Sequence, residues 1–117
     1  MKVNASFEDY RVVLTLQGEF DLSATDKFNR AVAEACQQAH LQQVVVDLQG
    51  VSFMDSSGLG ALLGRYQELS EEGIELILAA PSHRAGEILG LAGIDRYISI
   101  YPSVEHIPEI ENGEGLS

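Results

Sequence analysis

Hydrophobic and polar residues alternate along the first part of the chain. Residues 3–7 and residues 12–17 place apolar side chains at every second position, which predicts two β-strands. Residues 8–9 separate them as a turn, so the two strands are expected to form an N-terminal β-hairpin. Two later apolar runs, residues 44–48 and 74–80, are nearly continuous instead, each with a single acidic residue. Continuous runs of this length are typical of strands that are buried on both faces of a parallel sheet.

Between these strands, apolar residues follow the period of an amphipathic helix. Three such stripes cover residues 24–39, 59–69 and 85–92. Ser23 and Asp26 have the spacing of a capping box, which predicts that the first helix begins there.

Capping and helix-breaking residues predict the remaining boundaries. A loop is expected between the strand at residues 44–48 and the second helix. Ser82 is expected to cap the third helix, and Gly93 to end it in a left-handed conformation. Residues 97–101 predict a short last strand, and Pro108 would break a final helical turn.

The order of these elements predicts the fold class. A chain of 117 residues is long enough for one domain, which we expect over residues 1–108, with residues 109–117 as a disordered tail. Strand–helix–strand connections imply parallel pairing, and the hairpin adds an antiparallel edge. The prediction is a single α/β domain with a mixed, mostly parallel sheet and helices packed against it.

The chain is strongly acidic, with 18 Asp and Glu residues against 7 Lys and Arg residues and a net charge of −11. Direct binding of nucleic acid requires a positively charged surface and is therefore not expected. No apolar run approaches the roughly 18 residues of a membrane span, and the first residues contain no apolar signal segment. We therefore expect a cytoplasmic protein without a membrane partner. Cys36 is the only cysteine, which excludes an intrachain disulfide and favours a packing role.

Polar side chains concentrate where the second helix begins. Asp55, Ser56 and Ser57 precede the apolar stripe, and each could accept a hydrogen bond from a free N–H of the first turn. Capping alone is therefore one interpretation. The other is a phosphorylated serine, because a helix N-terminus stabilises a phosphate while the added charge disturbs a docked partner. The turn that ends in Asp21 follows another strand in the same sense, so the two turns could share one face of the molecule.

Enzymatic interpretations of the residues at the start of the second helix are weak. Gly58, Gly60 and Gly64 only faintly resemble a dinucleotide-binding pattern, because the third glycine is misplaced. A serine nucleophile requires a neighbouring histidine and acid, whereas the three histidines are scattered along the chain. Neither an H-x-x-x-H pair nor a cysteine pair is present to bind a metal. We expect a binding protein, not an enzyme, with no catalytic residue, cofactor or metal.

The block "SFMDSSGLGALLGRY", residues 52–66, closely resembles the signature of the anti-sigma-factor antagonists of the STAS family, and its sporulation members above all. The segment "LQGEFD", residues 16–21, is similar to that family's G-E-x-D turn before the first helix. The order of strands and helices also matches as far as Ile100. The resemblance implies the STAS fold over nearly the whole chain.

A partner-switching cycle is what the resemblance implies for function. The antagonist binds an anti-sigma factor that is itself a serine kinase, and thereby frees the sigma factor. The kinase phosphorylates the antagonist with ATP and releases it, and a metal-dependent PP2C-type phosphatase restores the active form. In the family, the phosphorylated hydroxyl belongs to the residue directly after the Asp of the motif, and in this chain that residue is Ser56. We expect the free protein to be a monomer. The residues expected to face the partner are Asp21, Asp55, Ser56, Ser57, Gly58 and Gly60.

The sequence allows two interpretations of its glycines and a second function. Gly58 and Gly60 either give a kinase active site clearance or simply pack the helix start against the sheet. The alternative function is a small nucleotide-binding STAS module in another signalling pathway.

Overall fold

The computed structural model describes residues 1–110 and begins with the predicted hairpin. β1 (Lys2–Glu8) and β2 (Arg11–Phe20) are paired in antiparallel fashion. Asp9 in the turn has a φ of +48°, in the left-handed region that Asp tolerates better than most residues. The predicted disorder of residues 109–117 falls, from residue 111 onward, outside the described part of the chain.

The remaining elements alternate between helices and strands, as the hydrophobic pattern predicts. In chain order they are η1 (Leu22–Ala24), α1 (Thr25–Ala35), β3 (Gln43–Met54), α2 (Ser56–Glu71), β4 (Glu75–Ala79), α3 (His83–Ala92), η2 (Ile94–Arg96), β5 (Ile100–Tyr101) and η3 (Val104–His106), where η denotes a 3₁₀ turn. The strands lie in the order β1-β2-β3-β4-β5, and the pairs that follow the hairpin are parallel. The predicted mixed, mostly parallel sheet is confirmed.

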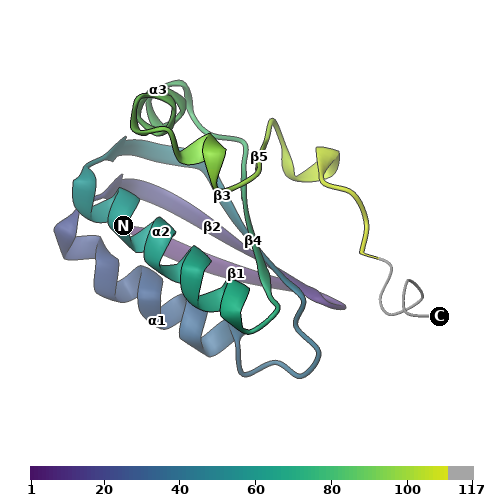
Figure 1. Ribbon diagram of the computed structural model, residues 1–117. Helices are drawn as coiled ribbons and strands as arrows, with labels where there is room; N and C mark the ends of the chain where they lie inside the picture. The colour runs from purple at the N-terminus through teal and green to yellow at the C-terminus, as the bar shows by residue number, and fades with distance from the viewer. Residues whose placement is uncertain (111–117) are drawn as a thin grey trace.

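Helices α1 and α2 lie side by side across one face of the sheet (Figure 1). Their buried residues meet apolar side chains that point toward this face from alternate strand positions. Phe28 of α1 packs against Phe20 of β2, with the ring centroids 5.0 Å apart. Other buried members of this core are Leu14, Leu16, Val46, Leu48, Met54, Leu62, Leu69 and Leu78.

The opposite face of the sheet carries a smaller apolar cluster. Val13, Val45 and Ile77, on three neighbouring strands, are buried there against Ile107 from the C-terminal segment. A strand that must be apolar on both faces explains the unbroken valine run of β3.

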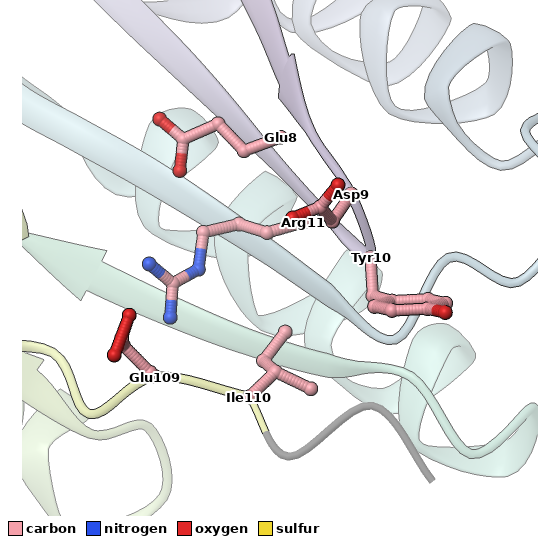
Figure 2. Close-up of a pocket in the computed structure, with 6 residues that line it drawn as sticks. All are labelled: Glu8, Asp9, Tyr10, Arg11, Glu109 and Ile110. Atoms are coloured by element: carbon pink, nitrogen blue, oxygen red, sulfur yellow. The ribbon is translucent and has the colours of Figure 1, made fainter.

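Arg11, at the start of β2, holds the C-terminal segment against this face. Its Nη2 donates to the Pro108 carbonyl oxygen at 2.8 Å, and its Nε donates to Gln43 Oε1 at 2.6 Å. Gln43 is buried, and its Nε2 donates in turn to Glu75 Oε1 at 3.0 Å. Figure 2 shows the Arg11 guanidinium directed toward the segment that carries Glu109. This network satisfies polar groups at the amino ends of three parallel strands.

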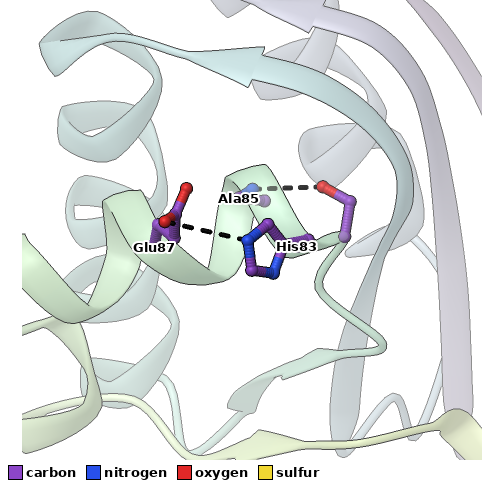
Figure 3. A network of polar contacts seen from close by, with 4 residues as sticks. His83, Ala85 and Glu87 are labelled. Carbon is purple, nitrogen blue, oxygen red and sulfur yellow. Dashed lines mark hydrogen bonds and ion pairs between the residues drawn. The ribbon is translucent and has the colours of Figure 1, made fainter.

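The third helix begins and ends where its capping residues predict. Ser82 Oγ accepts a hydrogen bond from the Ala85 backbone N–H at 3.1 Å, and Gly93 follows the helix with a left-handed φ of +71°. Figure 3 shows this turn together with the His83 imidazole, whose Nε2 lies 3.7 Å from Glu87 Oε2. In the described part of the chain, no helix has both the length and the apolar character to cross a membrane.

The predicted capping box at the first helix is wrong. Ser23 Oγ donates to Asp21 Oδ1 at 2.6 Å instead of accepting a bond from a helical N–H. The physical reason is η1, which turns the chain first, so that α1 begins only at Thr25. The helix also ends at Ala35, although the apolar stripe continues to residue 39.

The predicted loop before the second helix is also wrong, because β3 continues to Met54 instead of ending at Leu48. Gln49, Gly50 and Ser52 interrupt the apolar run, but the strand stays paired with β2 through two register shifts in the ladder. The local pattern of apolar and polar residues does not indicate pairing with a strand that is distant in the sequence. By contrast, β5 is shorter than the predicted strand at residues 97–101.

Candidate functional site

The candidate site lies where two neighbouring parallel strands end. Phe20, the last residue of β2, is paired with Met54, the last residue of β3. Asp21 and Asp55 therefore follow the two strands at the same level of the sheet. The Asp55 backbone N–H donates to the Phe20 carbonyl oxygen at 3.4 Å, which links the two turns. The prediction that both turns share one face of the molecule is confirmed.

Asp55 is the residue that caps α2. Its extended backbone, with φ −109° and ψ −172°, directs the side chain back over the first turn. Oδ1 accepts from the backbone N–H of Ser57 at 2.9 Å and of Gly58 at 3.1 Å. A cap of this kind stabilises the helix by about 1 kcal/mol.

The two serines are therefore not required for capping. Ser56 occupies the first helical position and is exposed, whereas Ser57 is half-buried. Of the two neighbouring hydroxyls, Ser56 is the one that solvent or a partner reaches more freely.

Asp21 keeps a negative charge beside this turn. The Ser23 hydroxyl, which donates to Asp21 Oδ1 at 2.6 Å, lowers the pKa of the Asp21 carboxyl. Backbone N–H groups of the same turn add to this effect, while burial opposes it. The carboxylate is thus ionised at neutral pH, and Ser23, which sequence reasoning assigned to helix capping, orients it instead.

The two glycines of the block differ in their surroundings. A Cβ atom at Gly58 would overlap the Phe20 carbonyl oxygen and lie 2.8 Å from Met54 Cγ. Gly58 therefore allows the start of α2 to pack closely against the ends of β2 and β3, which decides its role in favour of packing. A Cβ atom at Gly60 would meet no described atom within 4 Å. Packing does not explain Gly60, and the clearance interpretation stays a prediction for it.

Two apolar side chains at this end of the sheet were not among the expected site residues. Leu22 is 72% exposed and follows Asp21 directly, and Phe53 is 38% exposed, two residues before Asp55. An apolar residue inside an otherwise polar turn was the available signal for Leu22. Phe53 could not be found in that way, because its exposure depends on the unexpected length of β3.

The sole cysteine lies away from this site. Cys36 follows α1 in a groove between α1 and α2 and is half-buried. Burial raises the pKa of its thiol, and the nearby charges of Glu72 and Glu68 raise it further. A thiol whose ionised form is disfavoured is a poor nucleophile, in keeping with a packing role.

A hollow on the back of the sheet, the face opposite α1 and α2, is unsuited to an anionic ligand. It is lined by the side chains drawn in Figure 2, among which the carboxylates of Glu8, Asp9 and Glu109 surround the single guanidinium of Arg11. The hollow lies at the amino ends of the strands, away from Asp55. Among the described residues, no three His, Cys, Asp or Glu side chains gather closely enough to hold a metal ion.

Comparison with known proteins links this geometry to one family. A family model described as STAS domain matches residues 2–107. The anti-sigma F factor antagonist of Paenibacillus polymyxa is 32% identical over 114 residues, which cover 95% of this chain and 97% of that protein.

Solved structures show the same fold. The unphosphorylated form of the anti-sigma factor antagonist SpoIIAA superposes with a TM-score of 0.71 at 27% identity, covering 85% of this chain and 87% of that one. The phosphorylated form of the Bacillus cell fate determinant SpoIIAA gives a TM-score of 0.65 at 27% identity, covering 85% and 90% of the two chains.

Proposed function

The chain belongs to the STAS domain family, and we propose that it is an anti-sigma-factor antagonist controlled by phosphorylation of Ser56. The relative from Paenibacillus polymyxa, similar over almost its entire length, carries the first part of this function in its name. One observation carries the second part. Asp55 caps α2 by itself, so the Ser56 hydroxyl is left exposed on a rigid helix terminus.

The partner in this proposal is an anti-sigma factor that is also a serine kinase. Leu22 and Phe53 offer exposed apolar area for its docking, and Asp21 and Asp55 place two carboxylates beside them. Interfaces are strongest where apolar anchors are surrounded by complementary charge. The acidic turn thus favours a partner with a basic rim around an apolar pocket. Binding of the kinase at this end frees its sigma factor, which we expect to be of the sporulation class.

Phosphorylation of Ser56 would reverse this docking. The kinase transfers the γ-phosphoryl group of ATP to Ser56 Oγ, and ADP leaves. The product carries about −1.5 to −2 charges at neutral pH. The N–H groups of Ser57 and Gly58 already bond to Asp55, so the new charge lies beside a carboxylate rather than replacing it. The helix dipole lets the fold tolerate this charge, whereas a docked partner is repelled.

The chain takes part in this cycle as a substrate and a ligand, not as a catalyst. A PP2C-type phosphatase hydrolyses the phosphoserine and restores the docking form. We propose a cytoplasmic protein that is monomeric when free and contacts neither nucleic acid nor membrane directly. A nucleotide-binding module is the competing function, and tight kinase binding by a protein that binds no nucleotide would exclude it.

Mass spectrometry after incubation with the kinase and ATP tests the phosphorylation site. We expect one phosphoryl group on Ser56 in the wild-type protein and in the Ser57→Ala control, and none in Ser56→Ala. Ser56→Ala should still bind the anti-sigma factor, whereas Ser56→Asp should bind it less well. A label on Ser57 would contradict the assignment.

Gly60 is proposed to give the kinase active site access to Ser56. The open space beside Gly60 supports this, because a methyl group there would extend into it without touching the fold. Gly60→Ala should therefore slow phosphorylation while leaving the protein at least as stable. Unchanged phosphorylation kinetics would remove this role.

A further inference from the structure

Three of the seven basic residues line one groove, although the chain carries a net charge of −11. Lys2 lies on β1, whereas Lys27 and Arg30 lie three residues apart on α1 and therefore share one face of that helix. The groove has a volume of about 350 Å³, and its other lining residues are Val3, Asn4, Ala31 and Glu34. This concentration of positive charge has no part in the Ser56 site.

The groove runs along an open edge of the sheet. β1 is the outermost strand and is paired with β2 on one side only. Its seven residues pair with β2 in an uninterrupted register, from Lys2 opposite Gln17 to Glu8 opposite Arg11, so no bulge disturbs this edge. Alternate residues of such a strand direct their N–H and C=O groups away from the sheet. These groups form a regular template for one more strand.

Helix α1 forms the second wall of the groove. Lys27 Nζ donates to the Met1 carbonyl oxygen at 2.8 Å, which ties the start of β1 to the helix. An ammonium group has three donors, so Lys27 can still bond to a ligand. A groove between a strand edge and a helix is the arrangement in which added strands are recognised. The strand edge supplies main-chain hydrogen bonds, and side chains along the groove select the sequence.

We propose that this groove binds an extended acidic segment of a partner protein, added as a strand to the free edge of β1. Charge complementarity identifies the segment, because its carboxylates meet Lys27 and Arg30 of the helix wall, with Lys2 at the near end of the strand, while its main chain bonds to β1. Glu34 at the helix wall disfavours a uniformly acidic segment and helps to set the register. The negative charge of the whole chain disfavours long polyanions and anionic membranes, which would also face the acidic surface around the groove.

Fluorescence anisotropy with a short labelled peptide of alternating Glu and Val tests the proposal on the full chain. We expect saturable binding that weakens with salt, together with NMR shifts confined to β1 and the facing side of α1. The double variant Lys27→Glu/Arg30→Glu should lower the affinity by about tenfold or more. Arg84→Glu/Arg96→Glu is the matched control, because both arginines are exposed and the change in net charge is the same.

A second peptide, N-methylated at alternate residues, separates strand addition from charge attraction. N-methylation removes the donors that an added strand needs, so this peptide should bind much less tightly. Equal binding of both peptides would overturn the proposal, as would an equal loss in the control variant or shifts elsewhere in the chain. Tighter binding of anionic lipid vesicles would also overturn it, as would a dimer in sedimentation whose NMR contacts between the two copies lie at β1.

Discussion

Polar side chains at the two ends of the parallel strands differ in whether they are bonded within the fold. At the amino end, Arg11, Gln43 and Glu75 are bonded to one another on the back of the sheet. At the carboxyl end, Asp55 satisfies the helix terminus alone, and Ser56 is left exposed beside it. Polar groups bonded within the fold contribute to its stability, whereas exposed ones are available to a partner. Substitutions at the two ends should therefore separate into effects on stability and effects on binding.

Gly58 is the exception that limits this comparison, since it lies at the carboxyl end but serves packing. Gly58→Ala should lower the free energy of unfolding by about 2–3 kcal/mol, because the new methyl group overlaps the Phe20 carbonyl oxygen. Gly60→Ala is the control and should raise that free energy by about 0.5–1 kcal/mol, as expected for alanine in a helix. Urea-induced unfolding measures both. Similar losses of unfolding free energy in the two variants would show that the close contact with the Phe20 carbonyl oxygen does not explain the requirement for glycine at position 58.

Arg11 tests the amino end. Arg11→Met keeps the apolar stem but removes the donors to Pro108 and Gln43, and it should lower the free energy of unfolding by about 1–2 kcal/mol. The affinity for the anti-sigma factor should not change. Arg84→Met, on the exposed side of α3, is the control and should stay within about 0.5 kcal/mol of the wild type. A variant of Arg11 that kept full stability but lost binding would reverse the assignment of the two ends.

Leu22 tests the carboxyl end. Leu22→Ala should weaken binding of the anti-sigma factor by about tenfold while changing the free energy of unfolding by less than about 0.5 kcal/mol. Leu91→Ala removes a side chain that is also exposed, at 91%, but lies on α3. Calorimetric titration with the anti-sigma factor compares the affinities of the wild type and the two variants. Equal affinities for both variants would mean that Leu22 is not an anchor.

Asp21 should give the smallest effect, and one that depends on pH. The Ser23 hydroxyl lowers the pKa of the Asp21 carboxyl below its ordinary value of 3.8, so the folded state favours the ionised form. This contribution to stability is present above the ordinary value and is lost as the pH falls through the lower value of the folded state. Asp21→Asn should therefore melt slightly below the wild type at neutral pH, and the difference should shrink as the pH falls below the ordinary pKa of the carboxyl. A difference that grows in acid would contradict the direction of the shift.

The order of strands and helices along the chain, the hairpin and both caps of α3 could be predicted because each rests on local chemistry. Alternation reports which face of a strand is buried, and Ser82 and Gly93 act on their own helix termini. The continuation of β3 past Leu48 could not be predicted, since it depends on the distant strand β2. The failure at Ser23 has a different, local cause, because η1 turns the chain before α1 begins and the hydroxyl bonds to Asp21 rather than to the helix.

Within the candidate site, the sequence indicated the residues but not the division of roles among them. Asp55, Ser56 and Ser57 all have side chains that can cap a helix. Only the backbone geometry at Asp55 shows which of them accepts the N–H groups of the first turn. Likewise, Gly58 and Gly60 look equivalent in the sequence and differ only in what lies beside them.

The proposed switch is a phosphoryl group on Ser56 that weakens docking without unfolding the protein. Its most direct test is a calorimetric titration of the anti-sigma factor, loaded with a nonhydrolysable ATP analogue, into the phosphorylated and the unphosphorylated chain. Phosphorylation should weaken the affinity by about tenfold or more, in a protein whose melting temperature is nearly unchanged. Equal affinities for the two forms would contradict it.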